Sequence, residues 1–256
     1  MSEFLVLCVG AFFAGWVDAI VGGGGLIQVP LLFGTLPGLS AATLFGTNKL
    51  SSVWGTAFAA WRYGRHIAVP WDIALPAAAA AFAAAYCGAM TVALWPREQL
   101  RPVILVLLIA VTVYTYRRKE FGVPGSKTTH AGKVPLRAIA IGATVGFYDG
   151  FFGPGAGSFL IFLFVRFVAL DFLRGAAAAK IVNVATNLAA LLYFAPNGNV
   201  LWRYGFAMAL FNVAGAWWGS QLALRHESGF VRKVFLGVVV VLIAKFAYDT
   251  ARQAWP

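Results

Sequence analysis

Four ionisable residues lie within apolar stretches of this sequence and could do chemistry there: Asp18, Lys49, Asp149 and Lys180. A charge at the centre of a membrane helix costs about 2.5–3.5 kcal/mol even on lenient insertion scales, so such residues usually face a protein interior or a wet cavity. Two cations with two carboxylates indicate either an anion-binding site or structural ion pairs. Both interpretations hold if an anion exchanges with the carboxylate at the ammonium group.

Neutral polar residues accompany each lysine at helical spacing. They follow it at i+3 and i+7, which places all three on one face of a helix. Ammonium, hydroxyl and amide groups all donate hydrogen bonds to the oxygens of a small anion. The alternative is that the neutral groups only bond between helices, as they commonly do in membranes. The candidate residues are Asn48, Lys49, Ser52 and Thr56 in "GTNKLSSVWGT", and Lys180, Asn183 and Asn187 in "AAKIVNVATNL".

Glycine-rich stretches interrupt two of the apolar regions, as "VGGGGLIQVP" at 21–30 and "FGPGAGSF" at 152–159. Glycine in a helix interior costs about 1 kcal/mol relative to alanine, so we expect a break at each stretch. A half-helix that starts just after Gly25 or Gly155 would direct backbone N–H groups and its positive dipole end at an anion. The glycines assigned to this site are Gly22, Gly23, Gly24, Gly25, Gly153, Gly155 and Gly157.

Each candidate carboxylate, Asp18 and Asp149, comes four residues before its glycine stretch. One interpretation is that the side chain caps the half-helix and holds the glycine turn. The other is that it carries a coupling proton. The spacing favours capping slightly.

The composition is that of an all-α, polytopic membrane protein. Of the 256 residues, 61% are hydrophobic and only 11% are charged, too few for the surface of a soluble domain of this length. The formal net charge of +11 comes from basic residues in short loops, which indicates positive-inside topology rather than a nucleic-acid partner. The scattered cysteines and histidines predict no metal site or cofactor, and no residue cluster suits an enzyme.

An internal repeat appears when the chain is shifted by 131 residues against itself. Gly15, Asp18, Gly22 and Lys49 then align with Gly146, Asp149, Gly153 and Lys180. We expect a first transmembrane repeat at 1–118, a cytoplasmic linker at 119–133 and a second repeat at 134–256. Each repeat has four apolar regions, at about 4–40, 41–61, 69–95 and 99–116, and at about 137–169, 174–195, 200–224 and 230–250.

The first region of each repeat is too long for one crossing. Its 37 residues in the first repeat would extend roughly 55 Å as a helix, against a hydrocarbon core of about 30 Å. A re-entrant hairpin broken at the glycines places thirteen basic residues on one side and four on the other, whereas single crossings place ten and seven, a weak bias. This charge bias predicts hairpins, inverted repeats and both termini outside the cytoplasm. The four are Arg97, Arg101, Arg203 and Arg252.

The chain closely resembles the TauE/SafE family of membrane transporters. The resemblance rests on "AGWVDAIVGGGGLIQVP" and "GTNKLSS" in the first half, and on "GFYDGFFGPGAGSF" and "AAKIVNVATNLAAL" in the second. It implies a duplicated secondary transporter in a bacterial inner membrane that moves sulfite, thiosulfate, sulfonates or similar anions. It fixes neither the substrate nor the direction of transport.

We therefore expect a secondary transporter of a small sulfur-containing anion, bound near the membrane midplane by Lys49, Lys180 and the half-helix N-termini. The expected partners are the anion, a coupling H+ or Na+ ion and the lipid bilayer, with the oligomeric state left open. The alternatives are a passive anion channel and, less favoured, a membrane-embedded enzyme or assembly subunit. A channel would not accumulate its substrate against a gradient.

Overall fold

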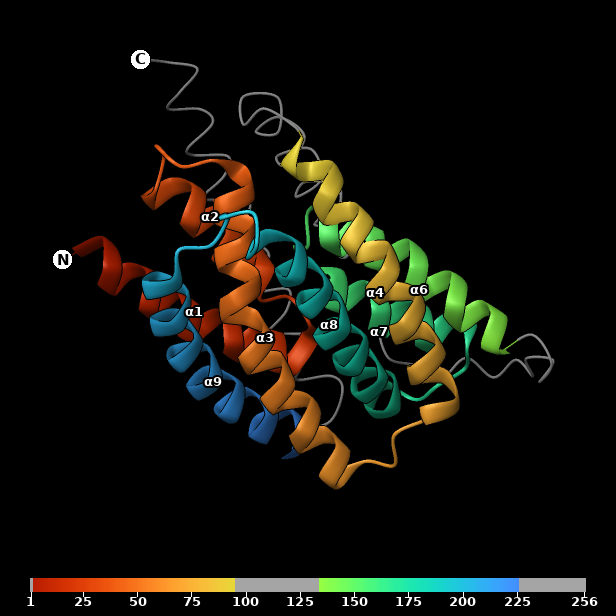
Figure 1. The fold of residues 1–256 in the computed structure, drawn as a ribbon. Helices are drawn as coiled ribbons and strands as arrows, with labels where there is room; N and C mark the ends of the chain where they lie inside the picture. Colours follow the sequence, from red (N-terminus) through yellow and green to blue (C-terminus); the bar gives the residue numbers. More distant parts are fainter. Residues whose placement is uncertain (1, 95–133, 226–256) are drawn as a thin grey trace, which may run out of the picture.

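The computed structural model describes residues 2–94 and 134–225, and all regular secondary structure in these ranges is helical. The all-α prediction is confirmed there. The linker at 119–133 and the apolar regions at 99–116 and 230–250 lie outside the described residues. The helices, labelled as in Figure 1, are α1 (Ser2–Val21), α2 (Gly25–Thr35), α3 (Ala41–His66), α4 (Trp71–Ala93), α6 (Val134–Phe151), α7 (Ala156–Phe167), α8 (Phe172–Phe194) and α9 (Trp202–Arg225).

Three of the described helices are long and apolar enough to cross a membrane: Glu3–Val21 within α1, α4 and α8. At 1.5 Å per residue, the 23 residues of α4 and of α8 span about 35 Å, which exceeds a hydrocarbon core of about 30 Å. The helices α2 and α7 are apolar but have only 11 and 12 residues, too few to cross alone. This combination is that of a helical membrane protein.

The helices of the two halves pack against each other in equivalent pairs. In Figure 1, α9 runs alongside α1 and α4 alongside α6, while α3 and α8 lie between these two pairs and contact each other. Small residues allow the close crossings: a Cβ atom at Gly88 of α4 would lie 2.3 Å from the carbonyl oxygen of Phe147. A Cβ atom at Gly219 of α9 would lie equally close to the carbonyl oxygen of Trp16. Both contacts obey the same shift of 131 residues along the chain.

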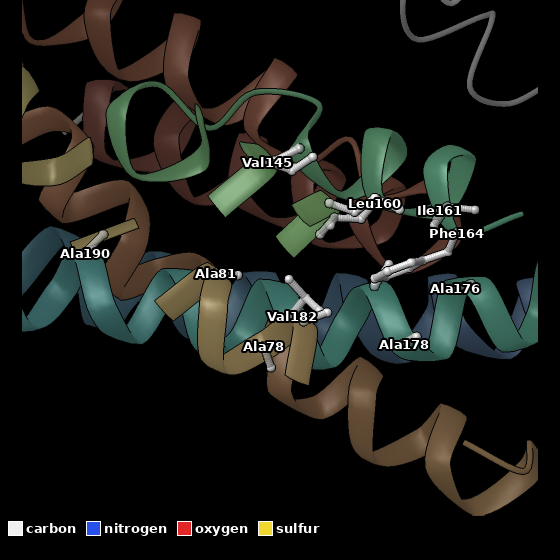
Figure 2. Packing of buried hydrophobic residues seen from close by; sticks show 14 of the residues in the cluster. Ala78, Ala81, Val145, Leu160, Ile161, Phe164, Ala176, Ala178, Val182 and Ala190 are labelled. Carbon is white, nitrogen blue, oxygen red and sulfur yellow. The ribbon is translucent and has the colours of Figure 1, made fainter. Parts of the chain in front are cut away.

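The apolar interior is rich in alanine, which lets helix backbones approach closely where packing rather than water drives association. Figure 2 shows Leu160, Ile161 and Phe164 of α7 beside the part of α8 that carries Ala176 and Val182. These five residues are buried in one continuous core cluster to which α1, α2, α3, α4 and α6 also contribute. This packing leaves little freedom for the short helix α7 to shift on its own.

Both expected helix breaks are present. The first helix ends at Val21 and the next begins at Gly25, while α6 ends at Phe151 and α7 begins at Ala156. Within these breaks, Gly22 and Gly153 have φ angles of +76° and +97°. Side chains rarely tolerate this left-handed region, so glycine permits the turn. Two short helices thus begin inside the protein.

Candidate functional site

Three buried ionisable residues and the partly buried Asp18 form two ion pairs between the halves of the chain. Lys49 Nζ lies 2.9 Å from Asp149 Oδ1, and Lys180 Nζ lies 2.9 Å from Asp18 Oδ2. The lysine side chains are 2% and 1% exposed, and the aspartate side chains 7% and 17%. Each lysine therefore neutralises an aspartate of the other half. The sequence suggested ion pairs but did not identify the partners.

Capped helices hold the two lysines in place. Helix α3 starts after Ser40, whose side chain accepts a hydrogen bond from the backbone N–H of Thr43, and α8 starts after Asp171, which caps it in the same way. Such N-caps typically stabilise a helix by about 1 kcal/mol. Lys49 and Lys180 each lie nine residues beyond the cap, so both ammonium groups start from the same depth along their helices.

The two ion pairs differ in their additional hydrogen bonds. Asp18 Oδ2 also accepts a hydrogen bond from Thr56 Oγ1 at 3.2 Å, and Lys180 Nζ donates to the backbone carbonyl oxygen of Asp18 as well. Within the described ranges, the Lys49–Asp149 pair has the single hydrogen bond between Nζ and Oδ1. One carboxylate is therefore held more firmly than the other.

A pocket lies between the ion pairs and the helix breaks, with an empty volume of about 350 Å³ that includes space open to solvent. Most of the residues predicted for the site line it. From the first half these are Asp18, Gly22, Gly25, Asn48, Lys49, Ser52 and Thr56, and from the second half Asp149, Gly153, Gly157, Asn183 and Asn187. Both halves thus contribute polar groups to one pocket.

The other four predicted residues are near the pocket but are not part of its lining. Lys180 is buried and bonded to Asp18. Gly23 lies in the break between α1 and α2. Gly24 and Gly155 are the N-cap residues of α2 and α7. Ala156 lines the pocket although the sequence analysis did not single it out. The repeat offered a signal, because Ala156 aligns with Gly25.

The side chains of both aspartates are engaged in the ion pairs. The N-cap residues Gly24 and Gly155 have no side-chain cap hydrogen bond, and the side chains of Asp18 and Asp149 are bonded to the lysines instead. These contacts favour the ion-pair interpretation of the aspartates, and the capping interpretation stays a prediction. The reason is that a buried ammonium group is a stronger hydrogen-bond donor for a carboxylate than a neutral backbone N–H.

The two glycine turns contact each other beside the pocket. A Cβ atom at Gly22 would lie 2.4 Å from the backbone carbon of Gly157, so only glycine allows this approach. Ser158 Oγ donates a hydrogen bond to the carbonyl oxygen of Val21 at 2.7 Å, and its backbone N–H donates to that of Gly22 at 3.2 Å. One backbone N–H at the start of α7, that of Ser158, is therefore engaged by the opposite turn.

Two asparagines in the pocket have an amide oxygen without a hydrogen-bond partner among the described residues. Asn48 and Asn183 are 4% and 6% exposed, and their Oδ1 atoms are buried without a hydrogen bond in the described structure. Buried polar groups are normally bonded, and exceptions often mark functional positions. A side-chain amide carries both an acceptor oxygen and a donor NH₂ group, so by rotating about its terminal bond each group can offer either atom to a ligand.

Comparison with known proteins places this arrangement in a family. The sequence profile described as "Sulfite exporter TauE/SafE" matches residues 7–246, nearly the whole chain. This chain belongs to the TauE/SafE family of membrane transporters. The resemblance seen in the sequence is thereby confirmed.

Curated relatives match this chain over almost its full length. The "Probable membrane transporter protein YfcA" of Escherichia coli K12 is 34% identical over 97% of this chain and 91% of its own length. The "Probable membrane transporter protein ORF9" of a Sinorhizobium species is 32% identical over 95% and 92%. A "Probable membrane transporter protein" of Haemophilus influenzae is 30% identical over 98% and 95%. No solved structure matches the chain.

The segments that carry the TauE/SafE resemblance are the ones that build the pocket. Both glycine turns and both lysine-bearing helix segments line it or support it. The sequence analysis missed a second buried polar contact nearby, in which Asn212 Nδ2 of α9 donates to Gln28 Oε1 of α2 at 3.2 Å and also to the carbonyl oxygen of Ala11. Gln28 and Asn212 are each isolated in an apolar helix, so no periodic spacing in the sequence indicated this contact.

Proposed function

We propose that this TauE/SafE protein is a secondary transporter of a small sulfur-containing anion, such as sulfite, thiosulfate or a sulfonate. The observation that supports the proposal is the meeting of a buried lysine, neutral hydrogen-bond donors and two half-helix N-termini around one pocket. The name of the family profile points to the same class of anion. The anion competes with the aspartates for the lysine ammonium groups, and it gains hydrogen bonds from Ser52, Asn183 and Asn187 on the facing helices.

We also propose that the two halves form an inverted repeat around this pocket. Three kinds of contact obey the 131-residue shift: the ion pairs, the glycine contacts at Gly88 and Gly219, and the pairing of α1 with α9 and of α6 with α4. In this architecture, transport comes from movement of one helix bundle against another while the site stays near the midplane. Each glycine-broken pair, α1 with α2 and α6 with α7, then enters and leaves the membrane on one face.

The proposed location is a bacterial inner membrane with both termini outside the cytoplasm, following the distribution of basic residues. Reporter fusions to each terminus test this orientation. A cytoplasmic signal from either terminus would contradict it.

The anion site is tested by thermal unfolding of the purified protein with sulfite, thiosulfate, sulfate, sulfonates and carboxylates. A ligand that binds the folded state raises its stability, by about 2.7 kcal/mol at a hundred times its Kd. We expect stabilisation by one or more sulfur anions in the wild type and none in Lys49→Gln. The exposed Arg174→Gln variant is the matched control and should respond as the wild type does. Stabilisation by cations or neutral solutes alone would overturn the proposal.

Flux measurements separate the transporter from the passive channel. In proteoliposomes with an imposed ion gradient, a secondary transporter accumulates the anion above its external concentration. A channel only equilibrates it with the membrane potential. Equilibration without accumulation under proton and sodium gradients alike would favour the channel.

A further inference from the structure

The two carboxylates of the pocket are not held alike. Asp18 Oδ2 accepts hydrogen bonds from Lys180 Nζ at 2.9 Å and from Thr56 Oγ1 at 3.2 Å, and the same ammonium group bonds to the Asp18 backbone. In the described ranges, the carboxylate of Asp149 has one hydrogen bond, from Lys49 Nζ at 2.9 Å. The carboxylate of Asp149 is freed when this one hydrogen bond breaks. Asp18 is freed only when several hydrogen bonds break.

The two lysines differ in the same direction. Lys49 lines the pocket, and its ammonium group, which has three N–H donors, gives one of them to Asp149. Lys180 is 1% exposed, is not part of the pocket lining and uses its ammonium on both the side chain and the backbone of Asp18. An anion that enters the pocket therefore meets Lys49 first.

An anion bound to Lys49 shares one ammonium group with Asp149. Two negative groups held at one site repel each other strongly when they are buried, and the usual result is that one of them takes up a proton. The partial positive charges at the starts of α2 and α7 attract the anion, but they do not remove its repulsion from the carboxylate.

The surroundings of Asp149 offer little other compensation. The charged groups that face it are Lys49 from α3 and, across the pocket, Asp18 from α1, which is already paired with Lys180 from α8. On its own helix, the Tyr148 hydroxyl donates to the carbonyl oxygen of Pro154 at 2.6 Å. Helix α4 packs closely against the glycines of α6 through Ala77, Ala81 and Ala85, and its Gly88 lies against Phe147, so these α4 contacts bring no charged group. Among the described residues, the bound anion thus finds no additional cation at Asp149.

We propose that Asp149 takes up one proton when an anion binds at Lys49, so that the anion and a proton occupy the pocket together. This inference rests on the proposed function and names its coupling ion. The carboxylate becomes a carboxylic acid with a proton that the bulk buffer supplies, Lys49 stays charged and no bond in the anion changes. Asp18 remains ionised and acts as a positioning residue that ties α1 to α8.

Proton uptake during binding tests this inference directly. The probes are thiosulfate and methanesulfonate, because their own charges are fixed near neutral pH. Calorimetric titration of the purified full-length protein in buffers of different ionisation heat gives the number of protons taken up per bound anion. We compare the wild type with Asp149→Asn and with the matched variant Asp18→Asn, and follow folding by thermal unfolding.

For the wild type we expect uptake of about one proton per anion and, where the two are fully linked, an affinity that rises about tenfold for each unit by which the pH falls. Asp149→Asn should bind the anion without proton uptake and with an affinity independent of pH. Asp18→Asn should keep the uptake per bound anion even where its affinity falls.

Binding to the wild type without proton uptake would overturn the inference while leaving the proposed function intact. This measurement uses the wild type alone, so it does not require that a variant folds. Unchanged uptake in folded Asp149→Asn would overturn it too. If neither probe binds to the wild type, the inference is overturned for these anions, while the anion pocket stands or falls with the stabilisation screen that includes sulfite.

Discussion

Lys49 Nζ and Asp149 Oδ1 lie 2.9 Å apart although the residues are 100 positions apart in the sequence. The equivalent pair, Lys180 and Asp18, is separated by 162 positions. Each contact joins a helix of the first half to a helix of the second, so neither half neutralises its buried charges by itself. The stability of the fold and the charge of the pocket consequently depend on the same two contacts.

The first prediction separates these two roles at Lys49. Lys49→Ala leaves the carboxylate of Asp149 buried without a counter-charge, which should lower the free energy of unfolding by about 3–5 kcal/mol. The double variant Lys49→Gln/Asp149→Asn replaces the ion pair by two neutral amides that can still hydrogen-bond. It should regain most of the lost stability without regaining anion binding. Thermal unfolding with and without thiosulfate measures both quantities.

A double variant as unstable as Lys49→Ala would mean that the ion pair does not account for the loss. Anion binding by the double variant would instead show that the ammonium group is not needed, and would remove Lys49 from the site.

The second prediction concerns the contact between the glycine turns. Gly22→Ala places a Cβ atom 2.4 Å from the backbone of Gly157 and forces a side chain into a φ of +76°. Backbone atoms cannot move aside as a flexible side chain can. We expect a loss of stability greater than about 1 kcal/mol, together with loss of anion uptake in proteoliposomes.

The matched control for this prediction is Gly34→Ala in α2. A Cβ atom there meets no atom within 4 Å, and the residue is helical. Alanine is the better helix former by about 1 kcal/mol, so this variant should be as stable as the wild type or more stable. Equal behaviour of the two variants would show that the close approach at Gly22 does not matter.

Much of this site could be predicted from the sequence because its signals are local. The glycine run around Gly22 breaks a helix wherever it lies, and a lysine inside an apolar helix must find a partner or a cavity. The choice of partner is not local: Lys49 bonds to Asp149 rather than to Asp18 of its own half, and only the packing of α3 against the second half decides this. The lysine partners of the aspartates are fixed by packing for the same reason, and the capping role expected for the aspartates stays a prediction.

The buried contact between Gln28 and Asn212 was missed on similar grounds. A single amide in an apolar helix carries no periodicity, and its partner is 184 positions away. The equivalent positions under the 131-residue shift are Phe159 and Ala81, so the repeat gave no support either. This asymmetry between the halves resembles that between Ser52 and Asn183 in the pocket.

The last prediction tests which polar groups of α8 act on the anion. Asn183 lines the pocket with a buried amide oxygen that has no partner, whereas Thr186, one turn further, donates its hydroxyl to the carbonyl oxygen of Asn183 and does not line the pocket. A hydrogen bond to a charged group contributes about 1.5–3 kcal/mol, so Asn183→Ala should weaken anion binding roughly 10- to 100-fold with little loss of stability. Thr186→Ala should lose about 1 kcal/mol of stability and keep its affinity. Calorimetric titration and thermal unfolding of both variants give the comparison, and an affinity loss confined to Thr186→Ala would show that Asn183 is a structural residue instead.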